Sequence, residues 1–213
     1  INKTGTPVVF VLLAGSAISF NGLEQELDAI LAAWYPGQRG GDAVADVLFG
    51  NYNPAGRLPV TFYSSTDELA DFEDYNMRAG NGFTYRYYNG DAMYPFGHGI
   101  SYTKFKYSDL TVSKTRLNNS DELFVTINVK NSGELDGEEV VQLYIKDIES
   151  TTWMPHKQLR GFKRISLKRR VDAYNYVCDN KGFTVVISLP DNIENFNFIK
   201  EAHPDSKIIE VMR

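Results

Sequence analysis

Cysteine and histidine are scarce in this chain. Cys178 is the single cysteine among 213 residues, so no disulfide can form within the chain and no cluster of thiolates can bind a metal. The three histidines, His98, His156 and His203, are far apart and lack the spacing of metal ligands. We therefore expect no metal site and no cofactor.

Excess positive charge and long apolar runs are lacking as well. The formal net charge is -5, and no stripe of lysine and arginine marks a nucleic-acid-binding surface, so we expect no nucleic-acid partner. No apolar run approaches the roughly 20 residues that cross a bilayer, so we expect no membrane partner. The chain begins with Ile1-Asn2-Lys3-Thr4, which is neither a start methionine nor a secretion signal. We expect a fragment, a processed product or one domain of a longer protein.

Aromatic residues, by contrast, are abundant. They form 13% of the chain and include 13 tyrosines, whereas the hydrophobic share of 43% and the charged share of 23% are ordinary for a globular protein. Strand packing is the common reason for such a share, and a surface that stacks on sugar rings is the other.

The first 62 residues alternate short apolar runs with helical spacing. Residues 7–13 form a continuous apolar run, typical of a strand covered on both faces as in parallel sheets. A second run, 29–35, ends at a Pro-Gly pair and is interpreted as a strand, although its periodicity also fits a buried helix. Apolar spacing predicts a helix over 42–49, and 58–62 is predicted as an edge strand because its proline cannot donate to a ladder. This order predicts an α/β fold with a mostly parallel sheet.

From about Ser64 to Gly99 the regular pattern stops. The segment contains a cluster of acidic residues and then a cluster rich in tyrosine. These are Asp67, Glu68, Asp71, Glu73 and Asp74, followed by Tyr85-Arg86-Tyr87-Tyr88. A connection of this length is usually functional or packed against neighbouring structure. We expect this one to lie over other parts of the protein.

After Ser101 the apolar period changes to two. Apolar residues alternate with others over 123–129 and 141–145, with the turn signal Asn131-Ser132-Gly133 between them. Such alternation predicts a half-buried antiparallel sheet. Further strands are predicted over 105–112, 161–167, 183–189 and 207–212. Several short strands within about a hundred residues predict a β-sandwich.

Motifs for nucleophilic or phosphate chemistry are lacking. Gly15-Ser16 has no second glycine of a G-x-S-x-G nucleophile turn, so Ser16 is interpreted as a turn residue. Gly37–Gly41 before the predicted helix could bind an anion, although a tight turn that needs glycine is the commoner meaning. The run 71–75 is the best carboxylate cluster for glycoside hydrolysis, but a solvated loop is again commoner.

Three strings in a fixed order are more specific than these patterns. They are Ala33–Gly50 with its WYPGQ and ADVLFG motifs, Asn53–Phe62 (NPAGRLPVTF) and Tyr94–Thr103 (YPFGHGISYT). Together they closely resemble the C-terminal half of family 3 glycoside hydrolases, which include β-glucosidases and β-xylosidases. Further segments are similar to a strand of that family and to its fibronectin-III-like domain: Pro7–Ser16, Asn131-Ser132-Gly133, Asp136-Gly137, Glu139–Tyr144 and Leu159–Arg164. The tail after about residue 168 departs from the family pattern.

The resemblance implies an organisation and an activity. It implies part of an α/β sandwich domain over 1–70, a long connecting loop over 71–100 and a fibronectin-III-like β-sandwich over 101–213. The parent enzyme would be a retaining, exo-acting β-glycosidase acting on β-linked glucosides, xylosides or oligosaccharides. Its Asp nucleophile would lie on an N-terminal TIM-like barrel, and its Glu acid/base upstream of residues 8–13. No residue here matches either motif, so we assign no catalytic residue and expect the chain alone to be inactive.

The loop residues Asp74, Tyr85 and Arg86 are the candidate substrate-binding residues. Carboxylates could accept hydrogen bonds from sugar hydroxyls, and Tyr85, Tyr87 or Tyr88 could offer a flat face to a pyranose ring. Arg86 could instead pair with Glu73 or Asp74 and hold the loop in shape, so that the loop only covers an interface. Two other functions stay open: a non-catalytic carbohydrate-contacting or structural accessory module, and an adhesion-type protein built on the sandwich.

Overall fold

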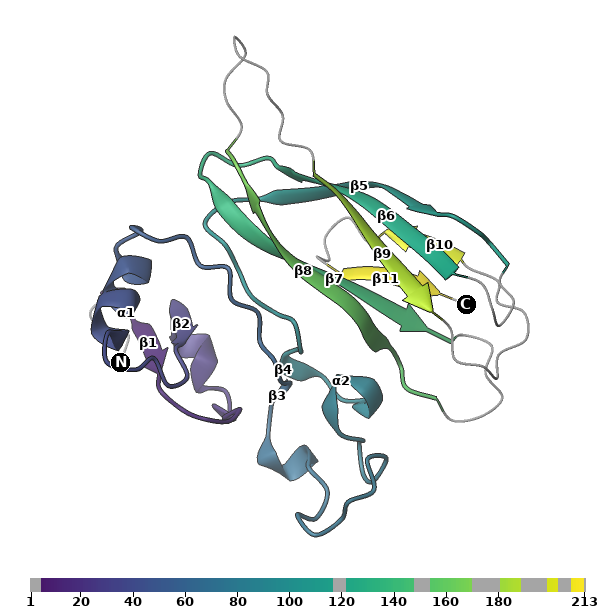
Figure 1. Ribbon diagram of the computed structural model, residues 1–213. Helices are drawn as coiled ribbons and strands as arrows, with labels where there is room; N and C mark the ends of the chain where they lie inside the picture. Colours follow the sequence, from purple (N-terminus) through teal and green to yellow (C-terminus); the bar gives the residue numbers. More distant parts are fainter. Residues whose placement is uncertain are drawn as a thin grey trace. The chain divides into compact units, whose positions relative to one another are not determined.

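The computed structural model describes residues 5–116, 122–147 and 154–169, and the backbone of three C-terminal strands, β9 (Lys181–Ser188), β10 (Ile199–Ala202) and β11 (Ile208–Met212). The chain forms two compact units (Figure 1). Unit 1 comprises Ile1–Tyr52 and Arg57–His98, and unit 2 comprises Asn53–Gly56 and Gly99–Arg213.

Unit 1 begins with a parallel pair of strands and an amphipathic helix. β1 (Val9–Leu12) pairs in parallel with β2 (Ala29–Ala32), and a short 3₁₀ helix, η2 (Leu23–Glu26), lies between them in the chain. The helix α1 (Gly40–Leu48) follows. The two strands and the helix predicted from the apolar runs are thus confirmed. Leu12, Phe20 and Phe62 form the buried centre of this unit.

The predicted mostly parallel sheet is wrong. Among the described strands, only β1–β2 and β11–β7 are parallel pairs, and the other pairings are antiparallel. The predicted third strand over 58–62 is reduced to β3 (Phe62–Tyr63), which pairs antiparallel with β4 (Ala92–Tyr94). The reason lies in the hydrogen bonding of the backbone, because the N–H and C=O of Leu58 bond to His98 O and Gly97 N, each at 2.8 Å, and Pro59 has no N–H. These backbone groups close a loop and cannot extend the β1–β2 sheet.

Unit 2 is a sandwich of two sheets. One has the strand order β5-β6-β9 and the other β10-β11-β7-β8, with β5 (Phe105–Val112), β6 (Glu122–Asn131), β7 (Gly137–Lys146) and β8 (Gln158–Leu167). Alternate residues of both sheets bury a shared core: Leu110, Leu123, Val125, Ile127, Val129, Val141, Leu143, Ile165 and Leu167. The sandwich and the strands predicted from the period of two are confirmed (Figure 1).

Strand β7 departs from the predicted half-buried pattern. Gln142 and Tyr144 alternate with the core residues, and a half-buried strand would expose them, but both are buried. The Tyr144 hydroxyl donates to Gln142 Oε1 at 2.6 Å, and Lys157 Nζ lies 5.0 Å from the centre of the Tyr144 ring. The segment before β8 therefore covers the second face of β7 at this point, which alternation along β7 alone could not reveal.

The turn Asn53–Gly56 belongs to unit 2 although its neighbours in the chain belong to unit 1. Asn53 Nδ2 donates to Asp136 O at 2.9 Å, and Asn53 Oδ1 accepts from Ser101 Oγ and Tyr102 N, both at 2.8 Å. A Cβ added at Gly137 would lie 2.8 Å from Asn53 Nδ2, so only glycine at position 137 lets the Asn53 side chain pack this closely against the backbone. Ala55 beside it is only 1% exposed.

We expect Asn53→Ala to destabilise unit 2 by about 2 kcal/mol, because three hydrogen bonds are lost, one of them part-buried. Hydrogen exchange of the β6 and β7 amides measures the effect on this unit. Asn51→Ala is the matched control, since its side chain makes one exposed hydrogen bond to Asp46 Oδ1 at 3.2 Å. Equal exchange rates in the two variants would show that the turn is only a surface connection.

Asp136 also holds the segment that follows β8. Its Oδ1 accepts from the Arg169 N–H at 2.7 Å and its Oδ2 pairs with Lys168 Nζ at 3.1 Å. The Arg169 hydrogen bond first, and Lys168 second, lower the pKa of this exposed carboxyl below its ordinary value. The interaction therefore contributes its full stability at pH values above the ordinary carboxyl pKa. This stability is lost as the pH falls through the lowered pKa of Asp136.

Candidate functional site

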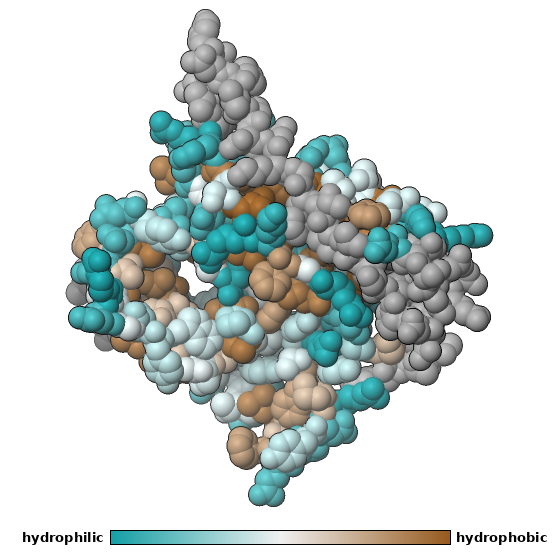
Figure 2. Space-filling model, in the orientation of Figure 1, coloured by the Kyte–Doolittle hydropathy of each residue, from teal (hydrophilic) through white to brown (hydrophobic). Residues whose placement is uncertain are grey.

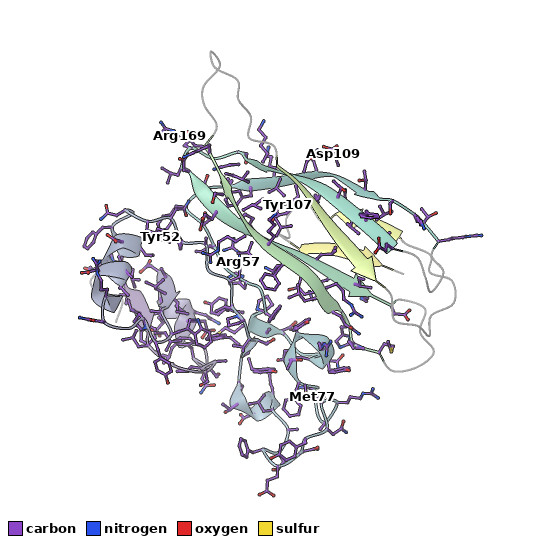
Figure 3. All side chains as sticks on the ribbon, in the orientation of Figure 1. Tyr52, Arg57, Met77, Tyr107, Asp109 and Arg169 are labelled. Carbon is purple, nitrogen blue, oxygen red and sulfur yellow. The ribbon has the colours of Figure 1, made fainter. Side chains whose placement is uncertain are left out.

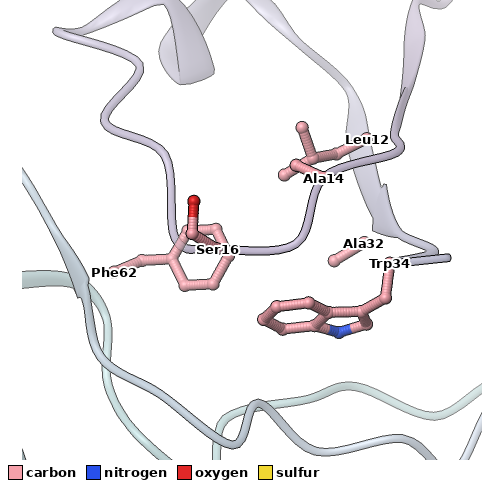
Figure 4. A pocket seen from close by; sticks show the side chains of 6 residues that line it. All are labelled: Leu12, Ala14, Ser16, Ala32, Trp34 and Phe62. Atoms are coloured by element: carbon pink, nitrogen blue, oxygen red, sulfur yellow. The ribbon is translucent and has the colours of Figure 1, made fainter.

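A small hollow lies at the carboxyl ends of the parallel strands in unit 1 (Figure 4). Leu12 and Ala32, which are opposite each other in the β1–β2 pair, line it together with Ala14, Ser16, Trp34 and Phe62. In α/β sheets, ligands bind outside the carboxyl ends of parallel strands. Trp34 has a φ of 52°, an unusual conformation for a bulky residue, of the kind that is concentrated at functional sites.

The chemistry of this hollow is limited. The Ser16 hydroxyl and the Trp34 indole N–H are the polar side-chain groups of its six lining residues, and none of the six side chains ionises between pH 2 and 12. Proton transfer to or from a substrate needs an ionisable group. The hollow has no room for a molecule as large as water and no side chain for acid–base catalysis.

An aromatic series extends from the hollow to the end of unit 1. Trp34 and Phe62, Phe62 and Tyr94, and Tyr94 and His98 have ring centres 6.5, 6.3 and 5.3 Å apart. Burial, and then the negative charge of Glu24, raise the pKa of the Tyr94 phenol above its ordinary value. Tyr94 therefore stays neutral to a higher pH, and the series acts as packing between strands rather than as a proton donor.

The second candidate is the connection between β3 and β4, whose base is closely packed. The Tyr63 and Tyr88 rings meet edge to face at 4.8 Å, the Thr84 N–H donates to Tyr63 Oη at 2.9 Å, and the Tyr88 hydroxyl donates to Glu68 Oε2. Two short helices lie in this connection, η3 (Thr66–Glu68) and α2 (Thr84–Tyr87). We call residues 71–78 the loop tip. In Figure 3, Met77 marks it, below α2.

The structure places the three predicted substrate-binding residues on two different elements. Asp74 is exposed in the loop tip and its Oδ1 accepts from the Asn76 N–H at 2.8 Å. Tyr85 and Arg86 are on α2, where the Tyr85 ring stacks on Phe96 with centres 4.3 Å apart and Arg86 is exposed. Within the described residues, no ion pair joins Arg86 to Glu73 or Asp74. A substrate role for these three residues stays a prediction.

Sequence reasoning passed over two other side chains of this loop. Phe72 and Tyr75 lie within the acidic run 71–75, and their rings are almost fully exposed. Their position between carboxylates could have selected these two residues. A sequence does not show, however, whether an aromatic side chain is buried or exposed. The exposure of these two rings is a finding of the structure.

We expect Gly82→Ala to destabilise the base of this loop by about 2 kcal/mol or more. Gly82 has a φ of 80°, where side chains are strained, and an added Cβ would collide with the carbonyl of Tyr87. Hydrogen exchange of the Phe83 and Tyr88 amides, which donate to Met77 O and Thr84 O at 2.9 Å, reports on it. Gly41→Ala on α1 is the control, because an added Cβ meets no atom there and alanine favours a helix. Unchanged exchange in Gly82→Ala would contradict the expectation.

Neither a metal centre nor a membrane span is found in the described part of the chain. There, no group of three or more His, Cys, Asp or Glu side chains could hold a metal ion. No helix among the described residues is long and apolar enough to cross a bilayer.

Comparison with known families assigns both units. The model of the Glycosyl hydrolase family 3 C-terminal domain matches residues 1–102, and that of the Fibronectin type III-like domain matches residues 139–171. The chain belongs to glycosyl hydrolase family 3. The resemblance expected from the three motif strings is thereby confirmed, and all of these strings except the final Thr103 lie within the first match.

Relatives in family 3 are similar along both units. The chain is 46% identical over 169 residues to a xylan 1,4-β-xylosidase of Xylanibacter ruminicola, covering 79% of this chain and 19% of the relative. It is 35% identical over 207 residues to a periplasmic β-glucosidase of Salmonella typhimurium, covering 93% and 26%. The chain therefore spans only about a fifth to a quarter of the length of these enzymes.

Solved structures of the family share the fold. β-Glucosidase 3B from Thermotoga neapolitana, in complex with glucose, matches with a TM-score of 0.70 and 30% identity over 87% of this chain and 26% of its own. A β-glucosidase from Kluyveromyces marxianus matches with a TM-score of 0.73 and 29% identity over 90% and 23%. These matches extend over both units, so the chain corresponds to a C-terminal part of larger family 3 enzymes.

Proposed function

We propose that the parent protein of this chain is a retaining, exo-acting β-glycosidase of the β-glucosidase or β-xylosidase type. The observation that carries the proposal is the identity of 46% to a xylan 1,4-β-xylosidase, with 35% identity to a β-glucosidase over 207 residues. Its substrates would be β-linked glucosides, xylosides or oligosaccharides, and its reaction the hydrolysis of O-glycosidic bonds.

This chain would shape and support the active site rather than carry out the chemistry. Retaining hydrolysis uses two carboxyl groups about 5 Å apart, one as nucleophile and one as acid and then base. As the family resemblance implies, the nucleophile would lie on an N-terminal TIM-like barrel and the acid/base in the chain before β1. Residues 1–70 would then complete an α/β domain, 71–100 would connect it, and 101–213 would form the supporting sandwich.

The full-length protein tests this proposal with 4-nitrophenyl β-D-xyloside and 4-nitrophenyl β-D-glucoside. We expect turnover of at least one of them, and NMR of the first-formed sugar should show the β-anomer, because two displacements retain the configuration. Formation of the α-anomer would contradict the retaining mechanism. Sugar binding without turnover would favour a non-catalytic carbohydrate-contacting module instead.

A further inference from the structure

Two aromatic rings of the loop tip have no partner in the described part of the chain. The side chains of Phe72 and Tyr75 are 96% and 90% exposed, and neither makes a ring contact there. The three tyrosines in or next to α2 do have partners. Tyr85 stacks on Phe96, the Tyr87 ring centre lies 5.8 Å from Arg78 Cζ, and the Tyr88 ring packs edge to face on Tyr63. The connection between β3 and β4 thus contains three tyrosines whose rings contact other side chains, and two aromatic residues, Phe72 and Tyr75, whose rings make no such contact in the described part of the chain.

The loop tip is held in shape by its own polar groups. Asp71 Oδ1 accepts from the Glu73 N–H and Asp71 O from the Asp74 N–H, both at 2.9 Å. Asp74 Oδ1 accepts from the Asn76 N–H at 2.8 Å. A loop that is already ordered loses less conformational entropy when a ligand binds. The exposed rings are thus carried on a preformed turn.

Carboxylates alternate with these rings and limit what can cover them. Asp71 and Asp74 each use one oxygen for the loop, and within the described residues their Oδ2 atoms and the Glu73 carboxylate have no hydrogen-bond partner. An apolar protein surface would bury these charges without compensation, which is costly. A polyanion would be repelled. In Figure 2 the lower end of the view, formed by this loop, shows brown and pale atoms beside teal ones.

A sugar chain satisfies both features. The face of a pyranose ring is apolar and packs on aromatic rings, while its hydroxyl groups donate to carboxylates that remain partly hydrated. We propose that Phe72 and Tyr75 bind a sugar unit of an oligosaccharide substrate, so that they set the preference for oligosaccharides over single-sugar glycosides. This inference rests on the proposed function and differs from the predicted role of Tyr85, whose ring is stacked on Phe96.

The test compares variants of the full-length protein on a short and a long substrate. The double variant Phe72→Ala/Tyr75→Ala should raise KM for xylotetraose or cellotetraose about tenfold, the loss expected for two stacking contacts. KM for the matching 4-nitrophenyl glycoside should stay within about twofold, because this substrate has a single sugar unit and the active site itself holds it. Phe72→Tyr and Tyr75→Phe keep the rings and should keep the wild-type KM. Phe49→Ala is the control, since Phe49 is an 82% exposed aromatic elsewhere in unit 1.

Two results would overturn the inference. One is an equal change of KM on both substrates. The other is a lowered unfolding temperature with an unchanged KM, which would mean that the rings pack against another part of the protein. A wild type that hydrolyses neither substrate refutes the proposed function instead. In that case, calorimetry of tetrasaccharide binding tests the stacking site by itself. The stacking site is refuted if the wild type does not bind the tetrasaccharide, or if the wild type and the double variant bind it equally well.

Discussion

A protein of residues 1–213 alone is expected to hydrolyse no aryl β-glucoside or β-xyloside above background. Retaining hydrolysis needs two carboxyl groups about 5 Å apart on either side of the scissile bond. The hollow of unit 1 has no ionisable lining residue, and the loop-tip carboxylates of Asp71 and Asp74 are committed to backbone hydrogen bonds through one oxygen each. Release of 4-nitrophenol from purified chain, compared with the full-length protein at equal concentration, measures the difference.

A contaminating glycosidase is the main source of error in this experiment. The control is therefore a set of carboxylate variants of the same chain, Asp71→Asn, Glu73→Gln and Asp74→Asn, purified in parallel. Residual turnover that is equal in all of them comes from a contaminant and agrees with the expectation. Turnover that disappears in one variant would show a catalytic carboxylate within residues 1–213 and would contradict it.

We expect Glu139→Ala to destabilise the sandwich by about 3 kcal/mol or more. Glu139 on β7 is 0% exposed, and its Oε1 accepts from the Tyr107 hydroxyl at 3.0 Å, which joins β7 to β5 of the other sheet. Removing this side chain leaves a cavity beside the core and deletes the hydrogen bond from the Tyr107 hydroxyl. Tyr107 is labelled in Figure 3, between the two sheets. Urea unfolding followed by hydrogen exchange of the β6 amides measures the loss.

The neighbouring residue supplies a matched control for Glu139. Glu138 pairs with Arg164 at 3.5 Å and accepts from Ser166 Oγ at 2.9 Å at the surface, so Glu138→Ala should cost less than about 1 kcal/mol. Glu139→Gln keeps the volume and an acceptor for Tyr107, so it should cost less than Glu139→Ala. Equal losses in Glu138→Ala and Glu139→Ala would show that burial of the carboxylate has no particular importance.

The elements of unit 2 illustrate how far local patterns can be trusted. The alternation over 123–129 predicted β6 correctly, because one face of this strand meets the core and the other does not. The same reasoning was wrong for Gln142 and Tyr144, which are both buried, and Lys157 from the segment before β8 lies over the Tyr144 ring. In unit 1 it was wrong for residues 58–62, because Leu58 bonds to residues almost forty positions further along.

The candidate site shows the same division. The aromatic and acidic composition of residues 71–88 is visible in the sequence, and it directed attention to Asp74, Tyr85 and Arg86. Which rings are engaged and which are free is decided by contacts such as Tyr85 with Phe96, and Tyr88 with Tyr63 and Glu68. Composition could not separate Phe72 and Tyr75 from these tyrosines.

The sequence by itself determined the family, through three ordered motif strings, and most strands and the helix α1, through their apolar periods. These features depend on neighbours within a few residues, so a linear pattern records them. Only the tertiary structure decided the antiparallel pairing of β3 with β4, the assignment of Asn53–Gly56 to the sandwich unit and the exposure of Phe72 and Tyr75. Each of these depends on which distant segment satisfies a backbone group or covers a side chain, and that choice is made by packing and hydrogen bonding between residues far apart in the chain.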